Sequence, residues 1–126
     1  MVVLGIALAT VASFVASALL YALPPVGAIV GRGSTPRPGI PVPVQMLLVV
    51  VRSLVASLLV ALLMLAAGWH GAGEGVLLGL GLTPLPALLL LGGVVHESTP
   101  IPAAGIHLID WIVKLAITGA LVGAFL

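Results

Sequence analysis

The feature that most constrains this chain is its last apolar segment, because charged residues lie inside it. Residues 103–126 read AAGIHLIDWIVKLAITGALVGAFL, which is long and apolar enough to cross a bilayer. Asp110 and Lys114 nevertheless lie well within it, and His107 precedes Asp110 by about one turn. An ionised group costs roughly 2.5–3.5 kcal/mol at the centre of a membrane helix, so such groups face protein, a partner or water. We therefore expect an integral membrane protein with a polar cluster inside its own bundle.

Composition places the whole chain in the membrane. Of 126 residues, 62% are hydrophobic and 6% are charged, and the mean hydropathy is +1.42. Soluble domains carry about 25% charged residues, so the lipid bilayer is the expected partner of this surface. A formal net charge of +1 is too small to attract nucleic acid, and the absence of cysteine excludes disulfides. Four apolar segments predict a single all-α transmembrane domain over residues 1–126, with helices at about 1–23, 44–67, 75–95 and 103–126.

Two sets of small residues are candidate helix-packing faces. In the first segment they recur at every fourth position, at Gly5, Ala9, Ser13 and Ser17. In the last segment Gly119 and Gly123 form a GxxxG pair. Such spacings let membrane helices approach closely, although chance also produces them in a chain so rich in glycine and alanine.

The beginning of the chain also has a competing interpretation as a signal peptide. Ala16-Ser17-Ala18 is similar to a signal-peptidase site. No Lys or Arg precedes the apolar run, however, so we expect the segment to remain as a membrane span.

Residues 24–43 form a connector that is rich in proline and glycine. Its six prolines and four glycines disfavour a continuous helix and favour extended backbone. Arg32 and Arg37 are the only basic residues in any predicted loop. The positive-inside rule therefore places this loop in the cytoplasm and both termini on the other side of the cell membrane. We expect the two arginines to anchor at lipid headgroups, and a docking arm for a partner or a lipid phosphate is the alternative.

The second apolar segment carries Arg52 roughly 12 Å from its start. At that depth the guanidinium either reaches back to the headgroups or pairs with an acid on a neighbouring helix. Trp69 follows the segment, where an indole commonly anchors a helix at the membrane interface. His70 and Glu74 are four residues apart, but two intervening glycines disfavour a helical metal-binding pair, so no metal site is predicted.

The third apolar segment contains Thr83-Pro84-Leu85-Pro86 near its middle. Each proline removes a backbone donor and clashes with the preceding turn, which predicts a kink at Pro84 and Pro86. Broken helices line ion sites in transporters, but a packing kink whose freed carbonyls bond to neighbours such as Thr83 is the expected outcome here.

The fourth segment is expected to contribute most of the polar cluster. Asp110 and Lys114 lie roughly 9 and 15 Å from its cytoplasmic start, with the acid first, which is the favourable order for an intrahelical ion pair. Arg52 enters from the same side and reaches a similar depth. We therefore expect Arg52 and Asp110 to lie within pairing distance, with Lys114 on the other side of Asp110 and His107 close by.

The chain resembles a bacterial membrane family that is catalogued as domain of unknown function 1761. The resemblance rests on Ile109-Asp110-Trp111-Ile112-Val113, followed by Ile117-Thr118-Gly119-Ala120-Leu121-Val122-Gly123, and on Ala18-Leu19-Leu20-Tyr21-Ala22-Leu23-Pro24. It implies four helices and maps the acid of the family's last helix onto Asp110. Lys114 and Leu20 depart from the family pattern, which has a tryptophan in place of Leu20. The family has no assigned activity, so the resemblance implies none.

The charges suggest that this small protein is part of something larger. Within the spans, Arg52 and Lys114 face only Asp110, and an unpaired buried ion is strongly unfavourable. Three alternatives follow: Glu97 supplies the missing acid, Lys114 is neutral, or the compensating acid belongs to another protein. A lipid phosphate could serve the same end for Arg52. We expect an accessory or structural subunit of a larger membrane protein complex, or a homo-oligomer.

The alternative is a small carrier or proton-coupled channel that uses Arg52, Asp110 and Lys114. The sequence offers no set of nucleophile, base and orienting residue. We therefore expect neither catalytic residues, nor an enzymatic activity, nor a cofactor.

Overall fold

A computed structural model describes residues 1–33 and 35–126, and all regular structure in them is helical. The helices are α1 (Val2–Ala22), α2 (Pro24–Gly31), α3 (Val42–Ala67), α4 (Ala72–Leu82), α5 (Pro84–His96) and α6 (Ile101–Ala124). α4 and α5 together form one span, and this span, α1, α3 and α6 are each long and apolar enough to cross a membrane. The prediction of an all-α membrane protein with four spans is therefore confirmed.

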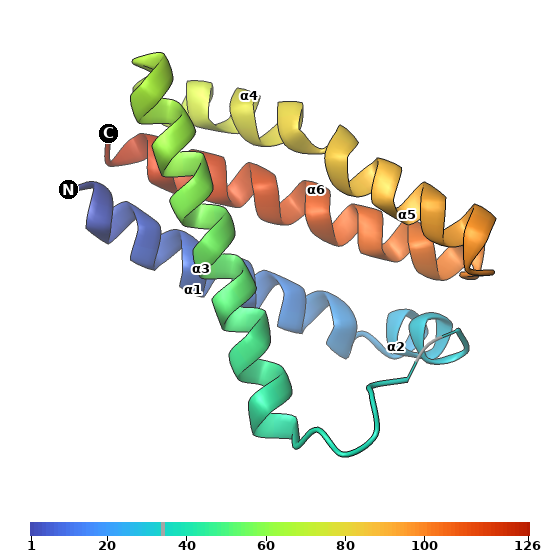
Figure 1. The fold of residues 1–126 in the computed structure, drawn as a ribbon. Coiled ribbons are helices and arrows are strands. Elements are labelled where there is room, and N and C mark those ends of the chain that lie inside the picture. Colours follow the sequence, from blue (N-terminus) through green and yellow to red (C-terminus); the bar gives the residue numbers. More distant parts are fainter. Residues whose placement is uncertain (34) are drawn as a thin grey trace.

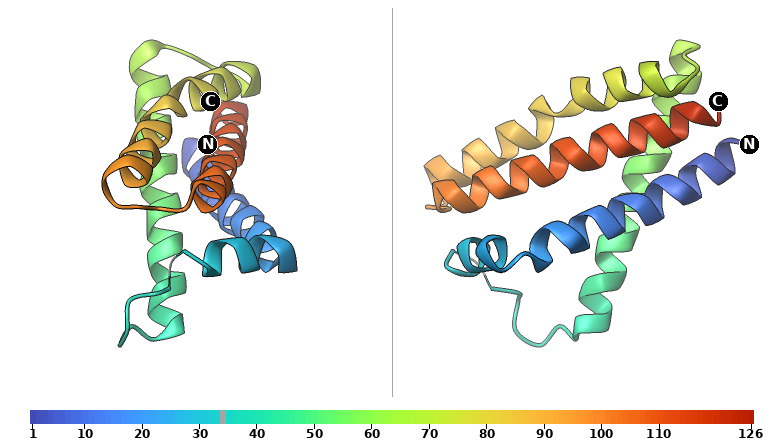
Figure 2. Two further views of the ribbon diagram at one scale, coloured as in Figure 1. Left: turned by 90° about the vertical axis from the view of Figure 1, so that its right-hand side faces the viewer. Right: turned by 180° about the vertical axis from the view of Figure 1, so that it is seen from behind.

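α6 is the central helix of the bundle. α1 packs along one side of it and α4 along another, and both run antiparallel to it (Figure 1). α3 crosses α1 and α6 obliquely, and its first half extends away from the other helices (Figure 2). Both termini lie at one end of the bundle, whereas α2 and the α5–α6 turn lie at the other (Figure 1).

Small residues of α1 form its contact with α6. The buried residues of α1 are Gly5, Ala9, Thr10, Ser13 and Ser17, a set that includes the whole predicted stripe. A Cβ atom at Gly5 would lie 3.0 Å from Cβ of Phe125 and 3.2 Å from the carbonyl oxygen of Leu121. A larger residue at Gly5 would therefore push the two helices apart.

Glycines on both helices bring α4 and α6 together backbone to backbone. The facing pairs are Gly71 with Gly123, Gly75 with Gly119, and Gly79 with Leu115. A Cβ atom at Gly75 would clash with the carbonyl of Gly119, and one at Gly119 would clash with the carbonyl of Gly75. The Gly71 N–H also donates to the Gly123 carbonyl at 3.0 Å. Since lipid supplies no hydrophobic driving force between helices, this close packing is what holds α4 against α6.

The apolar core fills the end of the bundle that is nearer to the two termini. Its buried members come from α1, α3 and α6 and are Ala9, Val60, Ala61, Met64 and Val122. At this end the three helices are therefore held together by apolar side chains packed against one another.

The connector after α1 differs from its prediction. Pro24–Gly31 is helical, so the prediction of extended backbone across residues 24–43 is wrong for its first eight residues. Pro24 and Pro25 occupy the first turn, where a helix needs no N–H donor, and Leu23 before them is extended. Proline therefore favours a helix when it lies in the first turn, although it would break the same helix in its interior.

The third span divides at Thr83, which ends α4 and precedes α5. Pro84 has no N–H to donate to the Leu80 carbonyl, and Thr83 donates to that oxygen instead. Its backbone N–H lies 3.2 Å from the Leu80 oxygen and its hydroxyl 2.7 Å from it. Thr83 itself has helical dihedral angles, with φ at −61° and ψ at −27°. The Leu80 carbonyl that Pro84 leaves free therefore accepts its hydrogen bonds from Thr83 in the same span. The kink at Pro84 and Pro86 stays a prediction.

Candidate functional site

Within the part of the chain that the structure describes, one ion pair forms, between Asp110 and Lys114 on successive turns of α6. Nζ of Lys114 lies 3.2 Å from Oδ2 of Asp110, and both residues are buried. The other carboxylate oxygen, Oδ1, accepts a hydrogen bond from the Ser17 hydroxyl at 2.5 Å. Both oxygens of this buried carboxylate are therefore engaged, which offsets much of the cost of removing it from water.

Arg52 does not pair with Asp110, so this part of the prediction is wrong. Within the described chain no carboxylate oxygen lies within 4.0 Å of the guanidinium. Cζ of Arg52 instead lies 5.6 Å from the centroid of the Trp111 ring, and Nζ of Lys114 lies 5.2 Å from it. The indole thus attracts both cations through its π face. Lys114 and Ser17 already bind the two carboxylate oxygens of Asp110. The oblique course of α3 places Arg52 beside Trp111 instead.

His107 joins the polar cluster through α1. Its Nδ1 lies 2.7 Å from the Tyr21 hydroxyl, and both side chains are partly buried. Because α1 and α6 are antiparallel, the pair Tyr21–His107 lies about one turn from the pair Ser17–Asp110. Two successive polar contacts therefore join α1 to α6.

Hydroxyl groups continue this polar face toward the middle of the bundle. The hydroxyls of Ser13 and Thr118 are 2.9 Å apart, and the hydroxyl oxygens of Thr10 and Ser57 are 3.5 Å apart. The buried Ser53 hydroxyl has no hydrogen-bond partner within the described chain. It lines a cavity of about 10 Å³, which is room for roughly one water molecule. Beyond these residues the apolar core closes the bundle.

A larger cavity of about 430 Å³ opens onto the polar face between α1, α3, α5 and α6. Its polar lining consists of Ser17, Tyr21, Arg52, His107, Asp110, Trp111 and Lys114. The formal charges of Arg52, Lys114 and Asp110 sum to +1, with His107 counted as neutral. The cavity therefore favours a ligand with a single negative charge and offers it several hydrogen-bond donors.

The remaining predicted residues lie outside this cluster. Arg32 and Arg37 are exposed in the connector and Glu97 is exposed after α5, whereas Trp69 packs half-buried against the apolar core.

His70 and Glu74, the two residues with metal-ligand spacing, make hydrogen bonds of their own. The Glu74 carboxylate accepts the His70 backbone N–H at 2.6 Å, and Nδ1 of His70 lies 3.1 Å from the Leu126 carbonyl oxygen. Across residues 1–33 and 35–126, no three His, Cys, Asp or Glu side chains gather as metal ligands.

Sequence reasoning missed the partners of the cluster on α1 and the glycines of α4. The sequence indicates Ser17 only as a packing residue, and Tyr21 only as part of the family resemblance. Extending the four-residue stripe of α1 by one step reaches Tyr21. Gly71, Gly75 and Gly79 repeat at the same spacing and were a detectable signal for the α4–α6 contact.

Comparison with known proteins identifies the family but no characterised relative. A family model described as Protein of unknown function (DUF1761) matches residues 4–123. No curated protein and no solved structure matches the chain. The chain belongs to the DUF1761 family, which confirms the resemblance seen in the sequence.

Proposed function

We propose that this member of the DUF1761 family is a structural subunit of a membrane assembly and that α3 is its assembly helix. The observation that supports the proposal is an exposed row of leucines on one face of α3. Its members are Leu47, Leu54, Leu58 and Leu65, with exposed fractions of 60, 39, 42 and 50%. Their separations of seven, four and seven residues match the seam between two helices that pack in a left-handed pair.

The course of α3 adds to this support. All buried residues of α3 lie at or after Ser53, so its first half is more exposed than its second half. Helices associate in lipid through packing, and a helix that diverges from its own bundle can gain that packing from a second helix. A second copy related by a two-fold axis along the membrane normal brings two α3 helices together in parallel. The broader form of the proposal is an accessory role beside other membrane protein subunits.

The proposal includes a location in a bacterial inner membrane, with residues 24–43 in the cytoplasm and both termini opposite. The common position of the two termini at one end of the bundle supports this topology (Figure 1). Arg32 and Arg37 at the other end supply its orientation.

Cysteine cross-linking in native membranes tests the assembly. Because the chain has no cysteine, Leu58→Cys introduces a single thiol into the leucine row. Leu8→Cys on α1 is the matched control, since the two leucines are 42 and 41% exposed. We expect oxidation to produce a disulfide-linked dimer from Leu58→Cys and little from Leu8→Cys. Equal yields from the two variants, together with a monomer in mild detergent without co-purifying subunits, would refute the proposal.

A second proposal, that of a small carrier or proton-coupled channel, is supported by the polar face of α6. Its hydrogen-bonded groups extend from Tyr21 and His107 through Asp110 and Lys114 toward Thr10 and Ser57. Proton or ion flux into liposomes that is lost in Asp110→Asn would favour carriage. Flux equal to that of protein-free liposomes would count against it. Neither proposal includes an enzymatic activity.

A further inference from the structure

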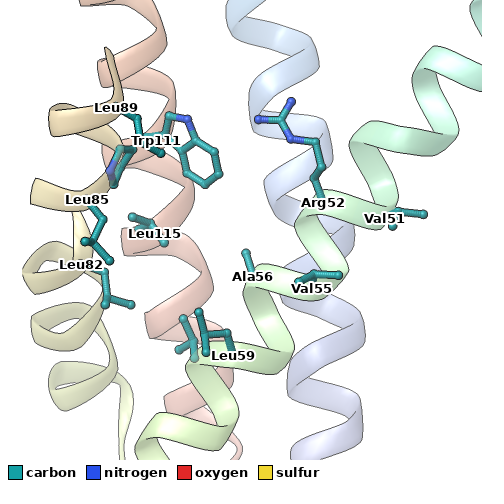
Figure 3. Close-up of a pocket in the computed structure, with 12 residues that line it drawn as sticks. Val51, Arg52, Val55, Ala56, Leu59, Leu82, Leu85, Leu89, Trp111 and Leu115 are labelled. Atoms are coloured by element: carbon teal, nitrogen blue, oxygen red, sulfur yellow. The ribbon is translucent and has the colours of Figure 1, made fainter. Parts of the chain in front are cut away.

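A second cavity, of about 410 Å³, occupies the wedge between α3 and α5. Leu82, Leu85 and Leu89 line one side, Val55 and Ala56 of α3 line the other, and Trp111 lies between the helices (Figure 3). α3 and α5 do not contact each other within the described chain, so the wedge is open on its outer side. Its walls are almost wholly apolar apart from Arg52 at one edge.

This apolar cavity adjoins the polar cavity at Arg52 and Trp111, which line both. On α3, the polar cavity uses Met46 and Val49, which precede Arg52. The apolar cavity uses Val51, next to Arg52, and then residues that follow it as far as Val60. From the α2 end inward, the order is therefore polar cavity, guanidinium and apolar cavity. A membrane lipid that enters from that end presents its parts in the same order, first the headgroup and then the acyl chain.

The charge of Arg52 selects the headgroup. The guanidinium has no carboxylate partner in the described chain, and a counter-charge stabilises an arginine at membrane depth. A phospholipid whose headgroup adds no positive charge to the phosphodiester, such as phosphatidylglycerol, has a net charge of −1, which balances the net +1 of Arg52, Lys114 and Asp110. A zwitterionic headgroup such as that of phosphatidylcholine has no net charge and leaves the +1 unbalanced. The planar guanidinium donates two parallel hydrogen bonds to phosphate oxygens more effectively than a lysine does.

We propose that the wedge binds an anionic phospholipid of the surrounding bilayer. Its phosphate contacts Arg52, and one acyl chain lies along the apolar cavity beside Trp111. This site does not depend on the proposed assembly, because the leucine row lies on a different face of α3 and lines neither cavity.

Quenching of Trp111 fluorescence by brominated lipids tests the site. The full-length chain carries Trp69→Phe so that Trp111 is the only tryptophan, and it is reconstituted into mixtures of phosphatidylcholine and phosphatidylglycerol in which one lipid has brominated chains. We expect phosphatidylglycerol to reach Trp111 with about fivefold preference over phosphatidylcholine. Arg52→Gln should abolish this preference and Arg52→Lys should retain part of it.

Arg37→Gln is the matched control, since it removes one positive charge from the connector and should leave the preference unchanged. Two results would overturn the proposal. One is a preference that survives Arg52→Gln, and the other is a Trp111 that neither brominated lipid quenches. Neither result affects the cross-link of Leu58→Cys, because that residue lies outside both cavities, so failure of the lipid site and failure of the assembly are distinguishable.

Discussion

At the scale of single residues, the buried carboxylate of Asp110 is the most demanding group in the chain. It is held by Lys114 from its own helix and by Ser17 from α1. The first contact is local and forms whenever α6 is helical, whereas the second forms only when α1 packs against α6. Asp110 therefore links the fold of one helix to its correct docking on another.

We expect Lys114→Met to lower the free energy of unfolding by about 3 kcal/mol, because it leaves the buried Asp110 carboxylate without a counter-charge. Adding Asp110→Asn should restore most of the loss, since an amide still accepts the Ser17 hydrogen bond without carrying charge. Unfolding in detergent micelles, followed by circular dichroism, measures both effects. A Lys114→Met variant as stable as the parent would contradict this account of the ion pair, and Arg37→Met controls for removal of an exposed charge.

Two buried serines provide a second comparison. Ser17→Ala should cost about 2 kcal/mol because it removes a hydrogen bond to a charged group. Ser53→Ala should change stability by less than about 0.5 kcal/mol, because the Ser53 hydroxyl bonds to no group of the described chain. The same unfolding measurement distinguishes them, and equal losses would show that the Ser17 contact carries no special energy.

At the scale of helices, the glycine contact between α4 and α6 sets the centre of the bundle. Glycine is a poor helix former, so a row of glycines in α4 is explained by the neighbour that it admits. Gly75 and Gly119 face each other, whereas Gly81 on the same span faces open space. Gly75 therefore allows α4 and α6 to approach closely, whereas Gly81 has no such packing role.

Gly75→Ala should destabilise the protein by about 2–3 kcal/mol, because its methyl group would meet the Gly119 carbonyl of α6. Gly81→Ala should instead leave stability unchanged or raise it by up to about 1 kcal/mol, since alanine is the better helix former and no atom lies in its way. Thermal unfolding in detergent measures the difference. The prediction fails if the two substitutions shift the midpoint in the same direction.

At the scale of the whole molecule, the two ends of the bundle differ in chemistry. The end near the termini is closed by the apolar core, whereas the end near α2 opens into the polar cavity. Arg32 and Arg37 lie beside the open end, in the connector to α3. In the orientation that we propose, the cavity opens on the cytoplasmic side.

Cysteine labelling should establish this topology. Thr35→Cys in the connector is expected to react with a membrane-impermeant maleimide only after spheroplasts are permeabilised, because the proposed orientation places the connector and its two arginines in the cytoplasm. His70→Cys, at the opposite end between α3 and α4, should react in intact spheroplasts. Both positions are exposed, so differences in reactivity report sidedness. The reverse pattern would invert the orientation.

The sequence by itself determined the spans and the identity of the charged residues of α6. Hydrocarbon requires every backbone group to be bonded within its own helix, so long apolar runs predict helices without knowledge of their neighbours. The Asp110–Lys114 pair followed from spacing on one helix for the same reason. The small-residue stripe of α1 was likewise visible as a four-residue period, although its partner helix was not.

Only the tertiary structure decided how these helices meet. The oblique course of α3 places Arg52 against Trp111, which left the expected Arg52–Asp110 pair unformed and opened the wedge beside α5. The glycine row of α4 and the hydroxyl of Ser17 gained their roles only from contacts with α6. Depth along a helix can be counted from the sequence, but the angle at which two helices cross depends on side chains distant in the chain, and no local pattern contains it.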